Sequence, residues 1–352
     1  MISTLLNILL FILILGILIF VHEFGHFITA KKSGVYIHEF SIGMGPSIKT
    51  WKGKDGIDYS LRAFPIGGYV QMAGEIYEDD DTNTVPKDQF MCNRPWYQRL
   101  IILCAGVFNN FLLAIVLLFV YALIWGGPSL EPRITSVDAN SPAAEAGIQK
   151  GDLIIKINDK KVSTIDKTQL LLLLRSKKET VDITVKHDDG KIETYEVKPK
   201  VEKIENLERR VIGVTMVSEV RKGFGNSIKY AFQKFASVIE QMWLTIKSLF
   251  TGGVSVKDLS GPVGIYTVVG ETRKSGVRYV LYLIAYLSIN LGLMNILPIP
   301  ALDGGHVLFL LIELITKKKV NEKVESIVTT IFFALLMILM VYVTIHDIIR
   351  FF

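Results

Sequence analysis

Cysteine is scarce in this chain, which has 352 residues and only two cysteines, Cys92 and Cys104. They form no C-x-x-C pair, so the sequence indicates neither a disulfide framework nor a thiolate metal site. Concentrated positive charge is also missing, because the formal net charge is +5 and no basic arm collects the lysines. The lack of such an arm argues against nucleic acid as a partner.

Charged residues are absent from several long stretches of the chain. Hydrophobic residues make up 50% of the sequence, and the mean hydropathy is +0.39. A helix needs about 20 apolar residues to cross a bilayer, and four segments meet this condition: 2–21, 100–131, 279–302 and 326–345. The first has no basic region before it and no A-x-A site after it, so we expect it to remain in the mature protein.

Lysines indicate the orientation of these four spans. Lys317, Lys318, Lys319 and Lys323 lie between the third and fourth spans, and short basic loops stay on the cytoplasmic side. This predicts that both termini and residues 127–277 are extracytoplasmic and that residues 31–99 are cytoplasmic. The ends of spans one and three then lie toward the same, cytoplasmic, membrane face.

The predicted fold class is a multi-pass α-helical membrane protein with a membrane-associated β region and an inserted α+β domain. Runs typical of strands occur at 133–137, 153–157, 181–185 and 194–197, with a helix near 169–175. The predicted order is transmembrane helix 1–30, β region 31–98, transmembrane helix 99–126, extracytoplasmic domain 127–218, amphipathic helix and linker 219–277, transmembrane segment 278–305, cytoplasmic connection 306–324 and transmembrane helix 325–347.

The segment from Ile228 to Leu249 carries an apolar stripe, because its apolar residues recur at spacings of four and three. With Lys229, Lys234 and Lys247 beside the stripe, the helix is compatible with the membrane interface. Packing against the extracytoplasmic domain explains the pattern equally well.

The extracytoplasmic segment contains Ser-Pro-Ala-Ala-Glu-Ala-Gly-Ile-Gln-Lys-Gly-Asp, from Ser141 to Asp152. This run resembles the signature of PDZ domains. PDZ domains bind extended peptides by adding a strand to a sheet edge, so the resemblance implies a peptide-binding or gating module. The alternative is a spacer whose groove is unused.

The first span ends in His22-Glu23-Phe24-Gly25-His26, an H-E-x-x-H sequence. On a helix the two histidines lie one turn apart on the same face and are able to bind one Zn²⁺, with Glu23 as general base. Ionisable groups within an apolar span are costly unless they serve a function. The alternative interpretation is a pair of histidines that reach toward the interface from a helix end.

Two histidines leave a catalytic zinc one protein ligand short. Asp303 fits best, because it follows the third span on the correct side and Pro298 and Pro300 would break the helix near it. His306 is the competing ligand. His346 and Asp347 end the fourth span at the opposite face, and we therefore exclude them.

Together these motifs resemble the site-2 protease family of intramembrane zinc metalloproteases, in particular the bacterial regulator-of-sigma-E protease type with a single PDZ domain. The motifs concerned are His22–His26, Gly106–Phe111, the PDZ-like segment and Asn295–Gly304, with Phe64–Val70 and Leu259–Gly264 as further matches. The chain departs from the pattern G-P-x-x-N at Val107 and has the pair Asn109 and Asn110, which leaves the role of Asn110 open.

The resemblance implies a role for each matching residue. His22, His26 and Asp303 become zinc ligands, Glu23 becomes the catalytic base, and Asn290 and Asn295 hold the substrate backbone. An edge strand that binds the unwound substrate is expected to consist of Ile66, Gly67, Gly68, Tyr69 and Val70.

The implied function is hydrolysis of peptide bonds within or near the transmembrane segments of single-span proteins, as in regulated intramembrane proteolysis in a bacterial plasma membrane. Expected substrates are regulators similar to anti-sigma factors, or remnants of signal peptides. Two alternatives remain: a PDZ-containing membrane scaffold or sensor with a non-catalytic zinc site, and a zinc transporter. The sequence does not define the oligomeric state.

Overall fold

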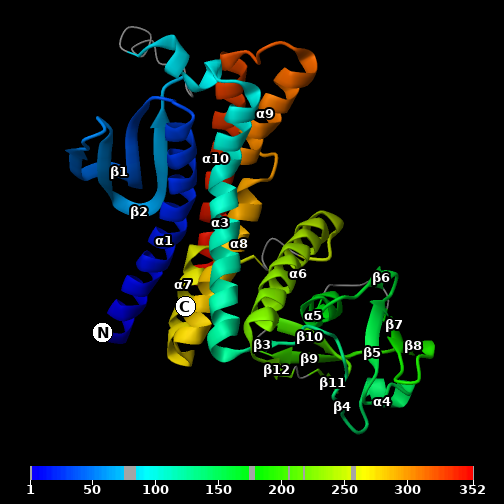
Figure 1. The fold of residues 1–352 in the computed structure, drawn as a ribbon. Helices are drawn as coiled ribbons and strands as arrows, with labels where there is room; N and C mark the ends of the chain where they lie inside the picture. The colour runs from blue at the N-terminus through cyan, green and yellow to red at the C-terminus, as the bar shows by residue number, and fades with distance from the viewer. Residues whose placement is uncertain are drawn as a thin grey trace. The chain divides into compact units, whose positions relative to one another are not determined.

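The computed structural model describes residues 2–74, 85–173, 179–204, 207–216, 219–254 and 259–351. The chain divides into two compact units (Figure 1). Residues 1–117 and 260–352 form one, here called the membrane unit. Residues 118–259 form the other, here called the inserted unit.

Among the described residues, four helices are long and apolar enough to cross a membrane, as predicted. They are α1 (Ile2–Lys32), α3 (Trp96–Trp125), α8 (Val277–Asn295) and α10 (Glu322–Phe351). The third is shorter than the predicted segment 278–305, because the chain leaves the helix after Asn295, ahead of Pro298 and Pro300.

Two helices of the membrane unit lie where the sequence suggested connections. The predicted linker contains α7 (Pro262–Ser275), and most of the predicted connection 306–324 belongs to α9 (Asp303–Thr316). Helix α7 packs on α1 through Val269, which is fully buried with Ile14 and Leu18. Helix α7 thus supports the helix that carries the zinc motif.

Helix α10 is attached to α7 through Asp347, which is completely buried. One carboxylate oxygen, Oδ2, accepts hydrogen bonds from the backbone N–H groups of Gly261 and Gly264, each at 2.8 Å. A carboxylate is stabilised at a helix N-terminus, where free N–H groups and the helix dipole favour negative charge.

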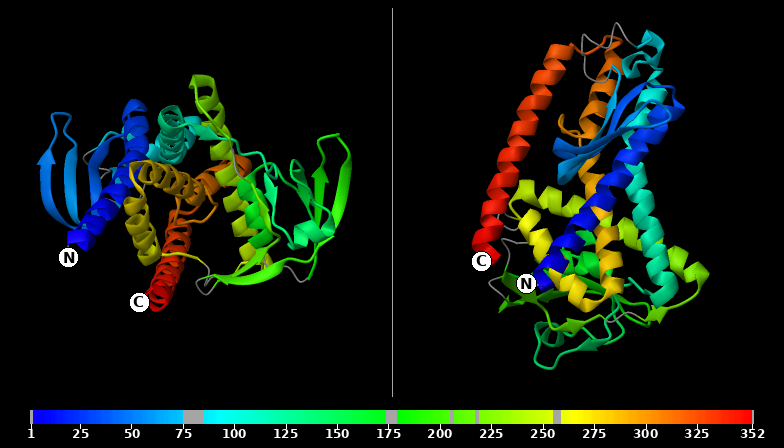
Figure 2. Two further views of the ribbon diagram at one scale, coloured as in Figure 1. Left: turned by 90° about the horizontal axis from the view of Figure 1, so that it is seen from below. Right: turned by 90° about the vertical axis from the view of Figure 1, so that its left-hand side faces the viewer.

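The predicted β region after α1 folds into two long strands, β1 (Ile37–Lys52) and β2 (Asp58–Met72). In their register, Glu39 to Ile42 lie opposite residues 58–61 and also opposite residues 68–71. The first part of β1 is therefore enclosed on both sides, and residues 68–71 form an outer edge. Phe40 and Val70 are buried in the same apolar cluster as Ala30 of α1. Figure 2 shows these strands beside α1.

Two 3-10 turns, η1 (Lys87–Gln89) and η2 (Met91–Asn93), lead from the β region into α3. The acidic run 78–81 lies outside the described residues.

A four-stranded antiparallel sheet in the order β6-β5-β7-β8 forms the centre of the inserted unit. Its strands are β5 (Leu153–Ile157), β6 (Lys160–Lys161), β7 (Val181–Lys186) and β8 (Ile192–Val197). The predicted strands at 153–157, 181–185 and 194–197 all belong to this sheet. Ile154, Ile183 and Val185 have no exposed surface and form its apolar core.

Helices α4 (Pro142–Ala146) and α5 (Ile165–Leu173) accompany this sheet. Helix α5 begins four residues before the predicted helix 169–175. Residues 174–178 lie outside the described part of the chain. Helix α6 (Phe224–Thr251) also belongs to the unit. So do three short antiparallel pairs: β3 (Gly127–Pro128) with β12 (Val220–Arg221), β4 (Ser136–Val137) with β11 (Val214–Thr215), and β9 (Lys200–Ile204) with β10 (Leu207–Val211).

Local chemistry explains the Ser-Pro-Ala-Ala-Glu-Ala-Gly run. The Ser141 hydroxyl accepts a hydrogen bond from the Ala144 N–H at 3.2 Å and caps α4, while Pro142 occupies the first turn. Gly147 ends the helix with a φ of +95°, a conformation that glycine adopts without strain. These residues therefore specify one short helix and its return toward β5.

Asp152, the last residue of the PDZ-like run, contacts His187, which lies in the turn between β7 and β8. Its Nδ1 lies 2.6 Å from Asp152 Oδ1, and its Nε2 lies 3.4 Å from Glu193 Oε2. The hydrogen bond to Asp152 and the charge of both carboxylates raise the pKa of His187 above its ordinary value of 6.5.

A pH dependence of stability follows from the raised pKa of His187. The folded state holds the proton more tightly than the unfolded state, so the stabilisation is complete below pH 6.5 and is lost as the pH rises through the raised pKa. Hydrogen exchange in the turn between β7 and β8, corrected for the intrinsic rate, is expected to accelerate over this range. His187→Asn should abolish the pH dependence; an unchanged profile in that variant would contradict the assignment.

Candidate metal centre

Two histidines of α1 form the first part of the site. His22 and His26 are separated by one helical turn, so their side chains project from the same face. Both are buried, with 7% and 8% of their surfaces exposed, and their Nε2 atoms lie 3.3 Å apart. The H-E-x-x-H pattern therefore brings two imidazole nitrogens together, as helix geometry predicts.

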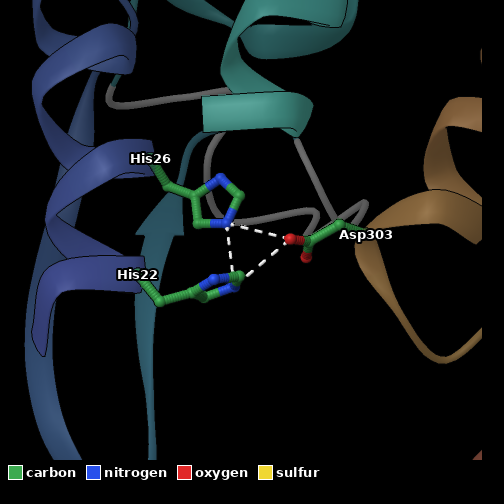
Figure 3. A group of neighbouring side chains, drawn as sticks. All are labelled: His22, His26 and Asp303. Atoms are coloured by element: carbon green, nitrogen blue, oxygen red, sulfur yellow. Dashed lines mark hydrogen bonds and ion pairs between the residues drawn. The ribbon is translucent and has the colours of Figure 1, made fainter. Parts of the chain in front are cut away.

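Asp303, from the first turn of α9, completes a triangle with these histidines (Figure 3). Its Oδ2 atom lies 3.2 Å from His22 Nε2 and 3.3 Å from His26 Nε2. Oδ2 is buried and has no hydrogen-bond partner among the described residues. Three atoms that carry lone pairs and converge on one point favour a cation between them.

The dimensions of the triangle fit Zn²⁺. Zinc binds histidine nitrogen and carboxylate oxygen at about 2.0 to 2.2 Å in tetrahedral geometry, which separates neighbouring ligand atoms by about 3.3 to 3.6 Å. The three distances between ligand atoms in the structure are 3.2, 3.3 and 3.3 Å, at the short end of this range. With three protein ligands, the fourth tetrahedral position stays available for water or substrate, which is typical of a catalytic site.

A hydrogen bond from Nδ1 of His26 determines that the other ring nitrogen, Nε2, faces the metal position. Its Nδ1 donates to the backbone carbonyl oxygen of Ile102 at 2.8 Å. A neutral imidazole that carries its proton on Nδ1 presents the lone pair of Nε2 to the metal. Ile102 lies on α3, so this helix orients the ligand.

Asn110 of α3 performs the same task for His22. It is fully buried, and its amide Nδ2 lies 3.1 Å from His22 Nδ1, while its Oδ1 has no partner among the described residues. A metal-binding His22 carries its proton on Nδ1 and requires an acceptor there. Turning the Asn110 amide by 180° places Oδ1 in that position and satisfies both groups. This contact answers the question that the sequence left open for Asn110.

Two glycines let α3 approach the histidines closely. A Cβ atom at Gly106 would lie 2.3 Å from His26 Nε2 and 2.7 Å from His22 Cε1. A Cβ atom at Gly25 would lie 2.4 Å from the carbonyl oxygen of Ala105. Only glycine fits at these positions.

Gly106→Ala is therefore expected to weaken zinc binding and hydrolysis together, because the added methyl group would displace both imidazole rings. Zinc content and peptidase activity of the purified variant measure the two effects. Gly16→Ala on α1 is the matched control, since no atom lies within 4 Å of a Cβ there. Normal zinc content in Gly106→Ala would show that the rings tolerate the methyl group.

Glycines also bring Asp303 to the right place. A Cβ atom at Gly304 would lie 2.3 Å from the carbonyl oxygens of Ile296 and Leu297, and one at Gly305 would lie 2.4 Å from the Ile299 carbonyl oxygen. The chain after α8 thus folds back tightly over the start of α9. Asp303 begins α9, whereas the predicted transmembrane segment 278–305 continued past it.

Glu23 lies between the histidines and next to β2. It is half-buried, and its carboxylate has no hydrogen-bond partner within the described ranges. A Cβ atom at Gly68 would lie 3.0 Å from Glu23 Cγ and 3.1 Å from Ile19 Cγ2. The edge of the β region therefore lies against the side chain of the residue that was predicted to act as base.

The predicted substrate-binding residues lie at different distances from the metal position. Asn295 Nδ2 lies 3.4 Å from His22 Nε2, so this amide borders the metal position. Asn290 Oδ1 is buried without a partner in the described part of the chain, which does not by itself connect it to the centre. Gly67, Gly68, Tyr69 and Val70 belong to β2, as does Ile66, whose side chain lies outside the described residues.

The competing ligand His306 is engaged elsewhere, because its Nδ1 lies 3.3 Å from Glu325 Oε1 of α10. Glu313, on the same helix as His306, pairs with Arg99 at 3.0 Å. Asp347 binds the start of α7. Within the described ranges, His22, His26 and Asp303 form the only group of three or more residues whose ligand atoms converge in this way.

Comparisons with known proteins give matches over nearly the whole chain. The model of peptidase family M50 matches residues 10–339. The regulator of sigma-W protease RasP of Bacillus subtilis is 31% identical over 419 residues, covering 97% of this chain and 98% of the relative. The zinc metalloprotease RasP of Bacillus licheniformis is 32% identical over 418 residues, with the same coverage. A Clostridium acetobutylicum protein with a provisional zinc metalloprotease name is 39% identical over 343 residues, 97% of each chain.

Proposed function

Because the chain belongs to peptidase family M50, the site-2 proteases, and is a membrane-bound zinc metalloprotease, we propose that it cleaves single-span membrane proteins within or next to their transmembrane segments. The non-catalytic scaffold and the zinc transporter are set aside, because the family and the relatives are peptidases. The substrates that we propose are regulators similar to anti-sigma factors, or remnants of signal peptides.

The main support for this proposal is that two of the three metal-site residues lie within the apolar helix α1. His22 and His26 belong to the apolar segment Ser3–Lys32. At 1.5 Å per residue, His26 lies about 9 Å before Lys32, the last residue of the helix. A site at that depth favours peptide bonds that are themselves in the membrane over those of soluble proteins.

The proposed chemistry assigns one role to each residue of the site. His22, His26 and Asp303 hold zinc, which supplies a Lewis acid that acidifies water and polarises a carbonyl group. Glu23 accepts a proton from the attacking water and passes it to the leaving amine. Ile102 and Asn110 keep both imidazole rings in the required tautomer.

A transmembrane substrate must unwind before attack, because helical hydrogen bonds hide its backbone. We propose that the unwound segment pairs with the outer edge of β2 at residues 66–70. Residues 68–71 pair with β1 on one side, and Gly68 lies against Glu23, so a strand added there would pass the base. The Asn295 amide is close enough to the metal position to hold the substrate carbonyl group. Asn290 remains a predicted contact.

We further propose that the inserted unit is a PDZ-type module that binds peptide or restricts access to the site. Its sheet and the capped helix α4 agree with such a module. The lysines Lys317, Lys318 and Lys319 support an extracytoplasmic location for this unit and both termini, with the metal centre toward the cytoplasmic side of a bacterial plasma membrane.

Purified protein in phospholipid vesicles, mixed with single-span proteins of known sequence, tests the proposal. We expect zinc-dependent cleavage that maps within or near the transmembrane segment and stops when a chelator is added. Cleavage confined to soluble segments far from the membrane would contradict the proposed substrate class, even if the protein remained an active zinc peptidase.

A further inference from the structure

The β region has a polar face on the side away from α1. Residues directly opposite each other in an antiparallel pair share a face, and the register places Ser41 opposite both Ser60 and Tyr69. Phe40 belongs to the other face and meets the Phe27 ring of α1 with centroids 5.1 Å apart. Ser41 has no exposed surface and Ser60 has 4%. Buried polar side chains need hydrogen-bond partners, so the β region itself must supply them.

Arg62 lies across this polar face and connects three segments of the β region. Its Nε donates a hydrogen bond to the Ser41 hydroxyl at 3.0 Å, and one terminal nitrogen donates to the carbonyl oxygen of Gly45 at 2.8 Å. The other terminal nitrogen donates to both carboxylate oxygens of Glu39, at 2.8 and 2.9 Å, and to the Tyr69 hydroxyl. The guanidinium group suits this task, because its donors point in fixed directions.

Tyr69 is held at its hydroxyl by an acceptor as well as by this donor. The hydroxyl donates to Glu39 Oε2 at 2.5 Å, and the guanidinium carbon of Arg62 lies 5.1 Å from the centre of the Tyr69 ring. The Arg62 and Glu39 side chains are only 22% and 14% exposed. Water screens charged hydrogen bonds less at such positions than on an open surface. The three residues, here called the Arg62 triad, therefore keep Tyr69 in one position.

Tyr69 belongs to the edge that was proposed above to receive the substrate. Within the described ranges, residues 68–71 pair with β1 alone, so the other side of this edge is open to an added strand. The neighbouring Gly68 lies against the base, since a Cβ atom there would be 3.0 Å from Glu23 Cγ. Fixing Tyr69 therefore fixes the distance between an added strand and Glu23.

We propose that Arg62 is a positioning residue for hydrolysis. With Glu39 it holds Tyr69, and through Tyr69 it keeps the edge at 68–71 in the register that presents one substrate bond to Glu23 and the metal. This role rests on the binding of substrate to that edge, as proposed above. Reacting atoms must approach to about 3 to 3.5 Å, and a misplacement of about 1 Å costs about a hundredfold in rate. A loosened edge would still bind substrate but would orient it poorly.

Kinetics of Tyr69→Phe and Arg62→Gln in phospholipid vesicles test this role. The substrate is a single-span protein that the unmodified chain cleaves at one mapped bond. We expect kcat per bound zinc to fall about tenfold or more in each variant, while KM changes less than about threefold. Zinc affinity should also stay within about threefold, because neither residue contacts a metal ligand. Tyr69→Phe deletes a single hydroxyl group and keeps the test decisive if Arg62→Gln does not fold.

Two readouts separate positioning from a general loss of stability. The double variant should lose no more activity than the more affected single variant, because both substitutions disable the same triad. Mass spectrometry of the products should show additional cleavage two residues from the original bond. A strand that shifts by two residues keeps every side chain on its face, whereas a shift by one does not.

Lys31→Gln is the matched control. It breaks a 2.6 Å ion pair with Asp55 in the same region of the molecule and leaves the triad intact, so kcat and the single product should be unchanged. Unchanged kcat in both test variants would overturn the role of Arg62. Losses that add in the double variant, that follow a loss of zinc, or that Lys31→Gln shares would also overturn it.

Hydrogen exchange tests the triad without any substrate. The amides of residues 68–71 should exchange about tenfold faster in Tyr69→Phe than in the unmodified chain, because the edge opens more often. Unchanged exchange would contradict the proposed restraint, whatever the substrates are. If the unmodified chain cleaved only soluble segments, the proposed substrate class would fail, and the same variants compared on that soluble substrate would still decide the role of Arg62.

Discussion

Replacing Glu23 by glutamine is expected to leave zinc bound and to reduce peptide hydrolysis by at least about a hundredfold. Glutamine has nearly the same shape but is unable to accept a proton, and general-base catalysis contributes about 10² to 10⁴ in rate. The ligand atoms belong to His22, His26 and Asp303, so the substitution removes none of them. Zinc content per chain and the rate of substrate cleavage in vesicles measure the two quantities.

The control for this variant is Glu271→Gln, an exposed glutamate on α7, which should retain full activity. Loss of zinc together with activity in Glu23→Gln would show that the carboxylate helps to hold the metal. Retained activity would show that another group takes the proton.

The part of the site that lies on one helix was predictable from the sequence. His22 and His26 are four residues apart, and helix geometry alone places such side chains on the same face. Asp303 required a second argument, because its position depends on how the spans are oriented; the lysines between spans three and four favoured Asp303 and left His306 as a competitor. In the structure, Asp303 Oδ2 lies 3.2 and 3.3 Å from the two histidines, whereas His306 faces Glu325.

The contribution of α3 to the site was not predictable in the same way. Gly106 and Asn110 contact histidines of α1 that lie 80 to 88 residues earlier in the chain, and no local pattern determines which face of α3 meets these histidines. The signal was present in the Gly106–Phe111 motif. Val107 stands where the family pattern G-P-x-x-N has proline, and this difference made the role of Asn110 hard to assign. In the structure Val107 is buried.

Secondary structure was predicted best where short-range chemistry decides it. The strands predicted at 153–157, 181–185 and 194–197 all lie in the central sheet of the inserted unit, because the alternation of side chains that indicates a strand depends on neighbouring residues. The extent of β1 and β2 was missed, because Glu39 to Ile42 pair on both sides with segments that only the tertiary fold brings together. The start of α9 at Asp303 was missed for the same reason, since the folded-back chain after α8 determines it.

Asp303→Ala is expected to remove most of the bound zinc and to stop proteolysis. The substitution deletes one of three protein ligands, and Oδ2 is the only carboxylate oxygen among the described residues that converges with His22 and His26. Loss of even an indirect partner of a metal ligand commonly weakens affinity 10- to 100-fold. We therefore expect a decrease in zinc affinity of more than about a hundredfold. Titration with a zinc-selective indicator measures it directly.

His306→Ala is the matched comparison, because it alters the only other side chain that competed for the third ligand position. Its Nδ1 faces Glu325 of α10 at 3.3 Å, and both side chains are about one-third exposed. The variant should keep zinc affinity within about threefold of the unmodified chain, because a partly exposed ion pair contributes little to stability. Full zinc content in Asp303→Ala together with zinc loss in His306→Ala would transfer the ligand role to the histidine. Asp303 would then act only by orienting the two imidazole rings.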